Sequence, residues 1–282
     1  MRKIWNVLFW VLMVVSVCLT SPASSDAQDT GNLYNWAFAP AFGTGLYTVE
    51  GQETLVVTFR PKIDLRRQVD DKIGIKLTLP LSFGLQNVDV DNIFGEDLPD
   101  MFSTISFVPG VEFDIPIGKR WQVRPFGNFG WGTRFGGDES AWIYFAGAKS
   151  RYQFEWGKAD LGFLSGLLWS GYSPTPGKEN DYARYMLGIE ADYPIGNVKF
   201  RKQQLLFRPH FLYYRYFNDL EFLAPVADEG VISLDQEVVL AVAVGTKEYQ
   251  KFWLFRPDRI GIGLNLSKNL TGISIFMRSV FD

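Results

Sequence analysis

The sequence has very little of what most catalytic and redox sites are built from. Among its 282 residues there is one cysteine, Cys18, and one histidine, His210. A single cysteine cannot form an internal disulfide, and it excludes cysteine-based zinc or redox motifs. The sequence also lacks glycine-rich phosphate loops and the fixed ligand spacing of calcium loops. We therefore expect no cofactor, no cofactor-binding residues and no metal site.

The charged residues show no marked excess of one sign. There are 28 lysines and arginines against 31 aspartates and glutamates, which gives a net charge of −3. Nucleic-acid-binding proteins usually carry a basic surface, so we expect no nucleic acid partner. By contrast, 47% of the residues are hydrophobic and 16% are aromatic, which is far too apolar for a disordered chain. This large aromatic surface requires an apolar environment.

The one long apolar run stands near the start of the sequence. Arg2 and Lys3 precede apolar residues from Ile4 to Cys18, and small residues follow. This order is typical of a secretory signal peptide, with cleavage predicted after Ala27 and Ala23 as a second possible site. No later stretch approaches the roughly 18 apolar residues that a membrane-spanning helix needs. We therefore predict a cleaved signal peptide at 1–27 and an exported domain at 28–282.

Within the exported domain, apolar residues recur at every second position, which is the period of a β-strand with two unlike faces. Over 73–86 this gives a strand of about 23 Å, which matches the apolar band of an outer-membrane barrel. The pattern predicts 12 strands, at 33–48, 54–66, 72–87, 102–117, 121–135, 141–155, 159–172, 182–193, 204–217, 235–246, 258–267 and 271–281. We therefore predict an all-β protein, a single 12-stranded antiparallel transmembrane β-barrel in the bacterial outer membrane. Its apolar residues should face lipid and its charged residues should face the lumen.

The connections between the predicted strands alternate in length. Most of those after even-numbered strands are tight, whereas those after odd-numbered strands include the long acidic segment 87–101. Outer-membrane barrels have short periplasmic turns and longer external loops, so both termini are predicted to be periplasmic. The segments 195–204 and 247–257 do not fit, because they are long on the periplasmic side. Outer-membrane lipids and lipopolysaccharide are the expected partners, and 87–101 is either a solvated loop or a site of divalent-ion bridging.

Tryptophans stand near the ends of predicted strands, as in the aromatic girdles at the two interfaces of a membrane barrel. Trp131, Trp142 and Trp169 fall on the predicted outer side. Trp121 and Trp156 fall at the periplasmic turns. A soluble all-β core would not sort its aromatic residues to strand ends, so the pattern favours the barrel.

A set of charged residues is predicted to line the lumen. The segment 110–118 recurs as 188–196, and each is followed by a strand that begins with Arg-Pro. Alternation therefore places Asp114 near Arg124 and Asp192 near Arg208. The network is interpreted as bracing the wall, and a charged constriction that selects a small solute is the alternative. Its predicted members are Glu112, Asp114, Arg124, Lys149, Arg151, Arg184, Glu190, Asp192, Arg208 and His210.

Catalysis by an activated serine needs a base beside the nucleophile, and His210 is the one histidine. Alternation places Phe207 and Phe211 toward lipid and His210 toward the lumen. A lipid-cleaving site would need its base on the lipid-facing side. We therefore predict no catalytic residues and no enzymatic activity.

The pattern of strands resembles the translocator barrel of autotransporters. The resemblance rests on the 12 strands, on the RPFGNFGWG strand at 124–132, on the GVEFDIPIG hairpin at 110–118 and on the closing strand at 271–281. In the closing strand Ile273, Ile275, Met277 and Phe281 are predicted to share one face. The resemblance implies that they form the assembly signal read by the barrel assembly machinery. Unlike the family pattern, the sequence ends in Asp282 rather than in the aromatic residue.

These observations support three hypotheses of function. About five residues separate Gln28 from the first predicted strand, which leaves no room for a passenger. The leading hypothesis is an autotransporter-type outer-membrane barrel without a passenger, with a non-enzymatic structural or transport role. The alternative is a narrow channel for small solutes, and the third is a lipid-modifying outer-membrane enzyme.

Overall fold

A computed structural model describes most of the exported domain. The described residues all belong to one compact unit, Leu33–Asp282. They are 43–49, 52–69, 71–86, 102–134, 140–175, 179–223, 231–247, 257–279 and 281. The predicted signal peptide at 1–27, the start of the first predicted strand and the acidic segment 87–101 lie outside them. No helix among the described residues is long and apolar enough to cross a membrane.

The domain is an antiparallel β-barrel of 12 strands, three of which are interrupted, so that 15 segments are counted. The interrupted strands are β2 with β3, β4 with β5, and β6 with β7. The segments are β1 Thr44–Val49, β2 Gln52–Phe59, β3 Lys62–Arg66, β4 Gly74–Thr78, β5 Leu81–Gln86, β6 Phe102–Phe107, β7 Gly110–Ile117, β8 Trp121–Arg134, β9 Ser140–Trp156, β10 Ala159–Thr175, β11 Asn180–Phe200, β12 Gln203–Leu223, β13 Val231–Thr246, β14 Arg259–Leu266 and β15 Leu270–Phe276.

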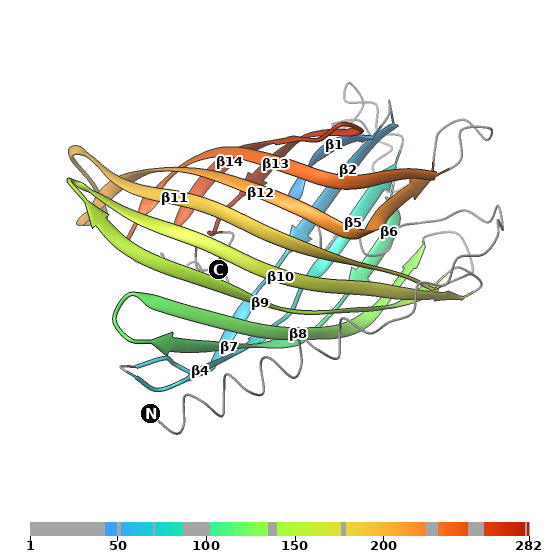
Figure 1. Cartoon of the computed structure of the whole chain (residues 1–282), viewed down its shortest axis with the longest axis horizontal. Helices are drawn as coiled ribbons and strands as arrows, with labels where there is room; N and C mark the ends of the chain where they lie inside the picture. Colours follow the sequence, from blue (N-terminus) through green and yellow to red (C-terminus); the bar gives the residue numbers. More distant parts are fainter. Residues whose placement is uncertain are drawn as a thin grey trace. The chain divides into compact units, whose positions relative to one another are not determined.

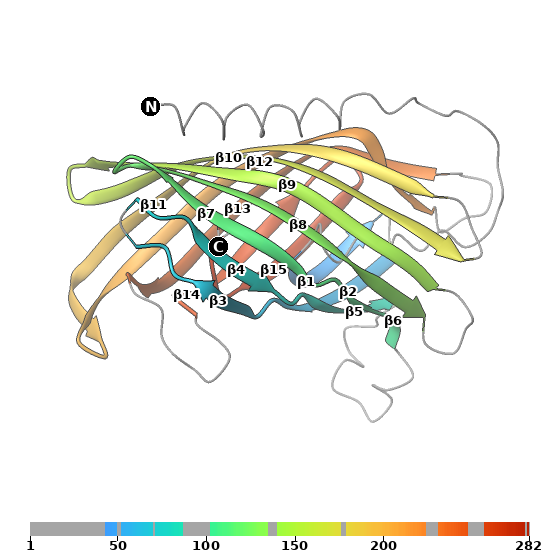
Figure 2. The ribbon, with the colours of Figure 1, turned by 90° about the horizontal axis from the view of Figure 1, so that it is seen from below.

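Each strand pairs with its neighbours in sequence, and the first pairs with the last. The seam between β1 and β15 runs from Thr44 opposite Ile275 to Val49 opposite Leu270. On the other side of the barrel, β8 pairs with β9 from Trp121 opposite Tyr152 to Thr133 opposite Ser140. Figure 1 and Figure 2 show the resulting closed wall, with its tilted strands around a lumen. The predicted fold class and strand number are therefore confirmed.

The ends of the barrel differ in their connections, and we call them the turn end and the loop end. The turn end contains the tight turns at 118–120, 157–158 and 201–202, and the loop end contains 87–101 and 224–230. The segment 195–204 was wrongly interpreted as a long connection. It is the end of the β11–β12 hairpin, which turns at Arg201 and Lys202 with positive φ angles of 50° and 70°. Figure 2 shows this hairpin in gold at the lower left.

Prolines cause the three interruptions, which lie side by side across the wall. Proline has no N–H to donate, so Pro61, Pro80 and Pro109 each break the ladder of their strand. Each proline carbonyl still accepts a bond from the next strand, at 3.0 Å from the nitrogens of Leu79, Val108 and Phe129. The Asn128 amide adds donations to Val108 O and Thr78 Oγ1, both at 2.9 Å. The barrel therefore remains continuous across this seam.

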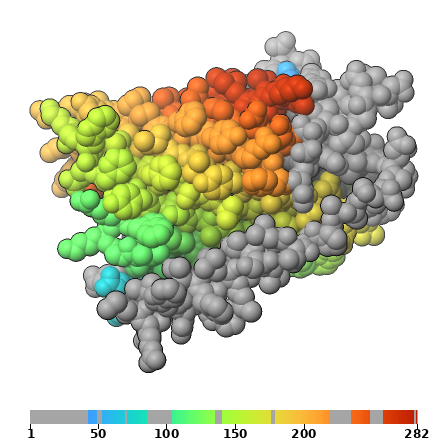
Figure 3. Space-filling model, in the orientation of Figure 1, coloured from blue at the N-terminus to red at the C-terminus, as the bar shows by residue number. Residues whose placement is uncertain are grey.

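The outer wall of the barrel is apolar. Large apolar side chains at every second position of β10–β15 are exposed, as the 48% exposure of Phe163 and the 52% exposure of Ile262 illustrate. Figure 3 shows this surface as oblique bands formed by successive strands. Such a coat fits the apolar band that faces lipid in a membrane barrel.

The lumen contains more apolar side chains than the sequence analysis expected. Toward the loop end, inward side chains pack into a buried cluster instead of a purely charged lining. The cluster is rich in tyrosine, whose ring buries apolar surface while its hydroxyl meets polar neighbours. Its most buried members include Tyr47, Ile143, Tyr172, Tyr182, Leu212, Leu234 and Leu270.

Two glycines of β8 allow a matched test of the proline seam. A Cβ on Gly130 would clash with the backbone of Phe107 and Val108, whereas a Cβ on Gly127 would meet nothing within 4 Å. We expect Gly130→Ala to lower the free energy of unfolding by about 1–3 kcal/mol, because the backbone must move. Gly127→Ala should leave it unchanged or slightly raised. Urea titration of the refolded barrel in lipid vesicles measures both, and equal effects would contradict this account of the seam.

Candidate functional site in the barrel lumen

The candidate site is a network of buried charges in the half of the lumen nearer the turn end. Its first part surrounds Glu112, which points inward from β7. Lys62 of β3 approaches Glu112 to 2.9 Å, Lys149 of β9 to 3.6 Å and Lys76 of β4 to 3.9 Å. Burial of a carboxylate is costly unless cations surround it. The three lysines meet this requirement and connect four strands.

Asp114, two residues further along β7, extends this part of the network. Its carboxylate contacts Lys76 at 2.6 Å and forms an ion pair with Arg124 of β8. Arg124 also reaches toward the lumen axis. Its Nη1 donates to the carbonyl of Phe281 at 3.0 Å, and its guanidinium lies 4.2 Å from the centre of the Phe281 ring. Arg124 thus joins the wall to the segment that follows β15.

The second part surrounds Glu190 of β11. Arg151 of β9 contacts Oε1 of Glu190 at 2.5 Å, and Arg259 of β14 contacts Oε2 at 3.4 Å. The hydroxyl of Ser279 donates to Oε2 at 3.1 Å. These side chains are nearly inaccessible, with 4% of Glu190 and 2% of Arg259 exposed. The carboxylate therefore depends on protein groups for its stabilisation.

Two further carboxylates complete this second part. Arg208 of β12 contacts Asp192 at 2.9 Å and Asp258 at 2.6 Å. Arg259 contacts the same oxygen of Asp258 at 2.9 Å. Asp258 stands just before β14, so a connection rather than a strand supplies it. It bridges the two arginines.

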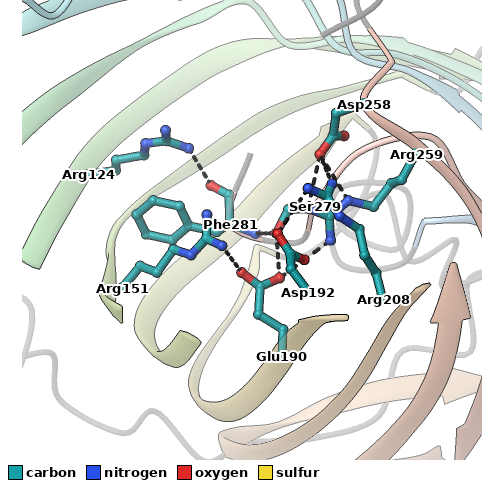
Figure 4. Close-up of polar contacts among 9 residues, drawn as sticks. All are labelled: Arg124, Arg151, Glu190, Asp192, Arg208, Asp258, Arg259, Ser279 and Phe281. Atoms are coloured by element: carbon teal, nitrogen blue, oxygen red, sulfur yellow. Dashed lines mark hydrogen bonds and ion pairs between the residues drawn. The ribbon is translucent and has the colours of Figure 1, made fainter. Parts of the chain in front are cut away.

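The main chain of Phe281 links the two parts (Figure 4). Its carbonyl accepts from Arg124, and its N–H donates to Ser279 Oγ at 3.2 Å. Ser279 in turn donates to Glu190. The Phe281 ring is fully buried, and the cations of Lys149 and Arg151 each lie 5.9 Å from its centre. One connected set of contacts therefore runs from β3 to β14 through the lumen.

The position of Phe281 corrects the sequence analysis. Ile273, Ile275 and Met277 point outward and are 53%, 52% and 54% exposed. Phe281 was expected on the same face, and this is wrong. The strand ends at Phe276, and the chain then turns into the lumen, where Ser279 and Phe281 find polar partners.

Most of the predicted network residues meet as expected. The contacts of Asp114 with Arg124 and of Asp192 with Arg208 are those that alternation indicated. Lys76 and Arg259 were missed although their strand positions place them on the lumen face, so the same signal could have found them. Lys62, Asp258 and Ser279 were also missed, and the last two lie outside regular strands.

Two predicted members have other neighbours. The guanidinium of Arg184 lies 4.7 Å from the centre of the Tyr214 ring, within the tyrosine-rich cluster. His210 faces the lumen, as predicted, and its ring packs edge-on against Phe276 at 5.0 Å. No group of three or more potential metal ligands occurs among the described residues.

A separate polar group near the loop end was not predicted. Buried Glu237 of β13 accepts from Tyr216 at 2.8 Å and from Asn265 at 2.6 Å. Ser274 of β15 donates to Asn265 Oδ1 at 3.0 Å. These bonds tie β12, β13, β14 and β15 together beside the closing seam.

The tryptophans of the predicted girdles stand at the two ends of the wall. Trp131 pairs across the strands with Trp142 toward the loop end, and they are 45% and 52% exposed. Trp169 donates to Asp181 at 2.7 Å. At the turn end, Trp121 donates to Ser150 at 2.6 Å and Trp156 is 76% exposed.

Removal of the charge of Glu190 tests the network. Glu190→Gln removes the carboxylate that Arg151 contacts and leaves Arg259 with Asp258 alone in a buried site, so the free energy of unfolding should fall by about 3–5 kcal/mol. The control is Asp160→Asn, which breaks the exposed ion pair with Lys247 at 3.2 Å and should cost less than about 1 kcal/mol. Urea titration in vesicles compares the two variants. A Glu190→Gln effect as small as the control's would show that the network adds little to stability.

Comparison with known proteins supports the fold but gives no relative in sequence. No protein-family model and no curated protein matches the chain. Among solved structures, the translocator domain of autotransporter NalP from Neisseria meningitidis is similar, with a TM-score of 0.53 and 11% identity over 82% of each chain. The siderophore receptor PirA from Pseudomonas aeruginosa matches with a TM-score of 0.37 and 8% identity, over 81% of this chain and 37% of that one. The chain thus has the fold of an autotransporter-type outer-membrane β-barrel.

Proposed function

We propose that the chain is an integral outer-membrane β-barrel of autotransporter type that acts as a closed structural element, without a passenger and without enzymatic activity. The observation that carries this proposal is the position of Phe281. Its ring is fully buried within the lumen, and its main chain joins the charges of both halves of the wall. Such an interior suits a braced barrel better than an open pore.

The cross-lumen contacts also argue against a passenger segment within this lumen. Arg259 reaches from β14 to Glu190 on β11, and Arg124 reaches from β8 to the segment after β15. An exported polypeptide that passed at this level would have to separate buried ion pairs. Each such separation costs several kcal/mol, because the charges are left without partners.

The outer surface supports a position in the outer membrane. Trp121 and Trp131 stand at the two ends of β8, ten residues apart. Ten residues span about 33 Å along a strand, or about 25 Å across the membrane at the usual tilt of such barrels. That is the height of the expected apolar band. The outward Ile273, Ile275 and Met277 further support recognition by the barrel assembly machinery.

A narrow channel for small solutes remains the second candidate, because Arg60 is accessible although it lies on the lumen face of its strand. Arg60, between β2 and β3, is exposed. Its charge nonetheless interacts with Arg184 and with lumen-facing Tyr47 and Tyr214. An accessible charge therefore lies among lumen-facing residues on the loop side of the charge network.

Conductance measurements distinguish the two candidates. The intact protein in planar bilayers should show no steady ion current, because the network and Phe281 occupy the lumen. Phe281→Ala should produce current steps, since it removes the buried ring. Phe163→Ala, which truncates a lipid-facing phenylalanine, is the control and should remain closed. A steady current through the unmodified protein would favour the channel.

Lipid hydrolysis tests the proposed lack of enzymatic activity. The ring of His210 contacts Phe276 inside the barrel, and its position gives it no access to lipid outside the wall. We therefore expect no release of fatty acids from phospholipid or lipopolysaccharide vesicles that contain the protein. Release that disappears in His210→Ala would instead support the lipid-modifying enzyme.

A further inference from the structure

The turn end of the barrel carries a concentration of exposed cations. Among the described residues at this end, two acids are exposed, Asp71 in the β3–β4 connection and Glu155 near the end of β9. Two of the cations contact carboxylates, Arg67 with Asp64 at 3.7 Å and Lys247 with Asp160 at 3.2 Å. The chain as a whole has a net charge of −3, so this end differs strongly from the average. The exposed cations are Arg66, Arg67, Lys72, Lys119, Arg120, Lys158, Lys199, Arg201, Lys202 and Lys247.

Three separate turns repeat one arrangement, in which an exposed aromatic ring stands within two residues of an exposed cation. In the β11–β12 turn the guanidinium of Arg201 lies 5.6 Å from the centre of the Phe200 ring. Aromatic rings prefer the headgroup level of a membrane, and lysines and arginines just beyond them reach phosphate groups. The three pairs are Arg120 with Trp121, Trp156 with Lys158, and Phe200 with Arg201.

Near the loop end, the described residues include such a pair in Phe217 and Arg215, and there the cation is already paired with Asp235 at 3.2 Å. There the indole of Trp169 donates to a carboxylate, Asp181. The exposed side chains of the described connections at that end include one cation, Lys268, and one acid, Glu179. The two aromatic girdles therefore differ in the charges beside them, and most of the exposed cations in the described residues lie at the turn end.

We propose that the turn end binds the phosphate groups of anionic phospholipids in the leaflet that surrounds it. The cations project from successive hairpins around the barrel instead of forming one compact patch. Lipid headgroups surround a barrel in the same way, whereas an acidic protein would contact one side of it. This inference goes beyond the proposed structural role, since it assigns a lipid class to one interface.

Lipid selectivity in reconstituted vesicles tests the proposal. The probes are spin-labelled phosphatidylglycerol and phosphatidylcholine, whose immobilised fractions give the relative association constant of the anionic lipid. The test variant is Arg120→Gln with Lys158→Gln, in two different turns. The matched control is Arg215→Gln with Lys268→Gln, which also removes one arginine and one lysine, both exposed and away from the turn end.

The proposal expects a preference for phosphatidylglycerol in the unmodified protein that weakens as salt is added. The test variant should lose at least about fivefold of that preference, since one cation near an anionic surface contributes about that factor. The control should keep it. Equal preference in test and control variants would overturn the proposal.

Competition experiments distinguish a lipid headgroup from other anions that the cations could bind. At an ionic strength matched with sodium chloride, loss of the preference in inorganic phosphate alone would indicate a site for the free anion and overturn the proposal. Loss in the presence of polyglutamate at the same matched ionic strength would point to an acidic polypeptide and overturn it as well. A protein that does not insert into vesicles would contradict the proposed membrane barrel itself, which is a distinct result.

Discussion

The structure depends on pairing the charges inside the barrel wall. Glu112 and Glu190 are buried carboxylates on different strands, and each is held by cations from strands on both of its sides. In a medium with little water an unpaired carboxylate would cost several kcal/mol, so these contacts hold the strands at fixed separations. Phe281 joins the two sets through its main chain. The side chains in the lumen thus stabilise the barrel wall by connecting strands across it.

The wall stays continuous at the three proline interruptions because hydrogen bonds between neighbouring strands persist beside them. Pro61, Pro80 and Pro109 would each end a strand in isolation, yet their carbonyls accept from the neighbouring strand. Asn128, on an uninterrupted strand, supplies side-chain donations at the same place. Gly130 lets the backbones approach closely there. The prolines that interrupt three strands and the groups that restore the hydrogen bonding therefore lie next to one another, on four adjacent strands.

Alternation predicted the strands and much of the lumen, because a period of two fixes the face of every residue within a strand. The contact between Asp114 and Arg124 follows from this rule and a short hairpin. The rule fails where strands end. It was extended past Phe276 and placed Phe281 toward lipid, and it could not place Asp258, which precedes β14. The burial of the tyrosine cluster depends on side chains from many strands, which no single strand pattern reveals.

The short seam between β1 and β15 has a consequence for assembly. It pairs residues 44–49 with residues 270–275, the most distant pairing in the sequence, and such non-local contacts form slowly. The bond from Arg124 to Phe281 spans the lumen and requires a closed wall around it. Protection of Ser279 and Phe281 from solvent is therefore a kinetic marker of closure. It separates molecules that have finished folding from those whose first and last strands are still apart.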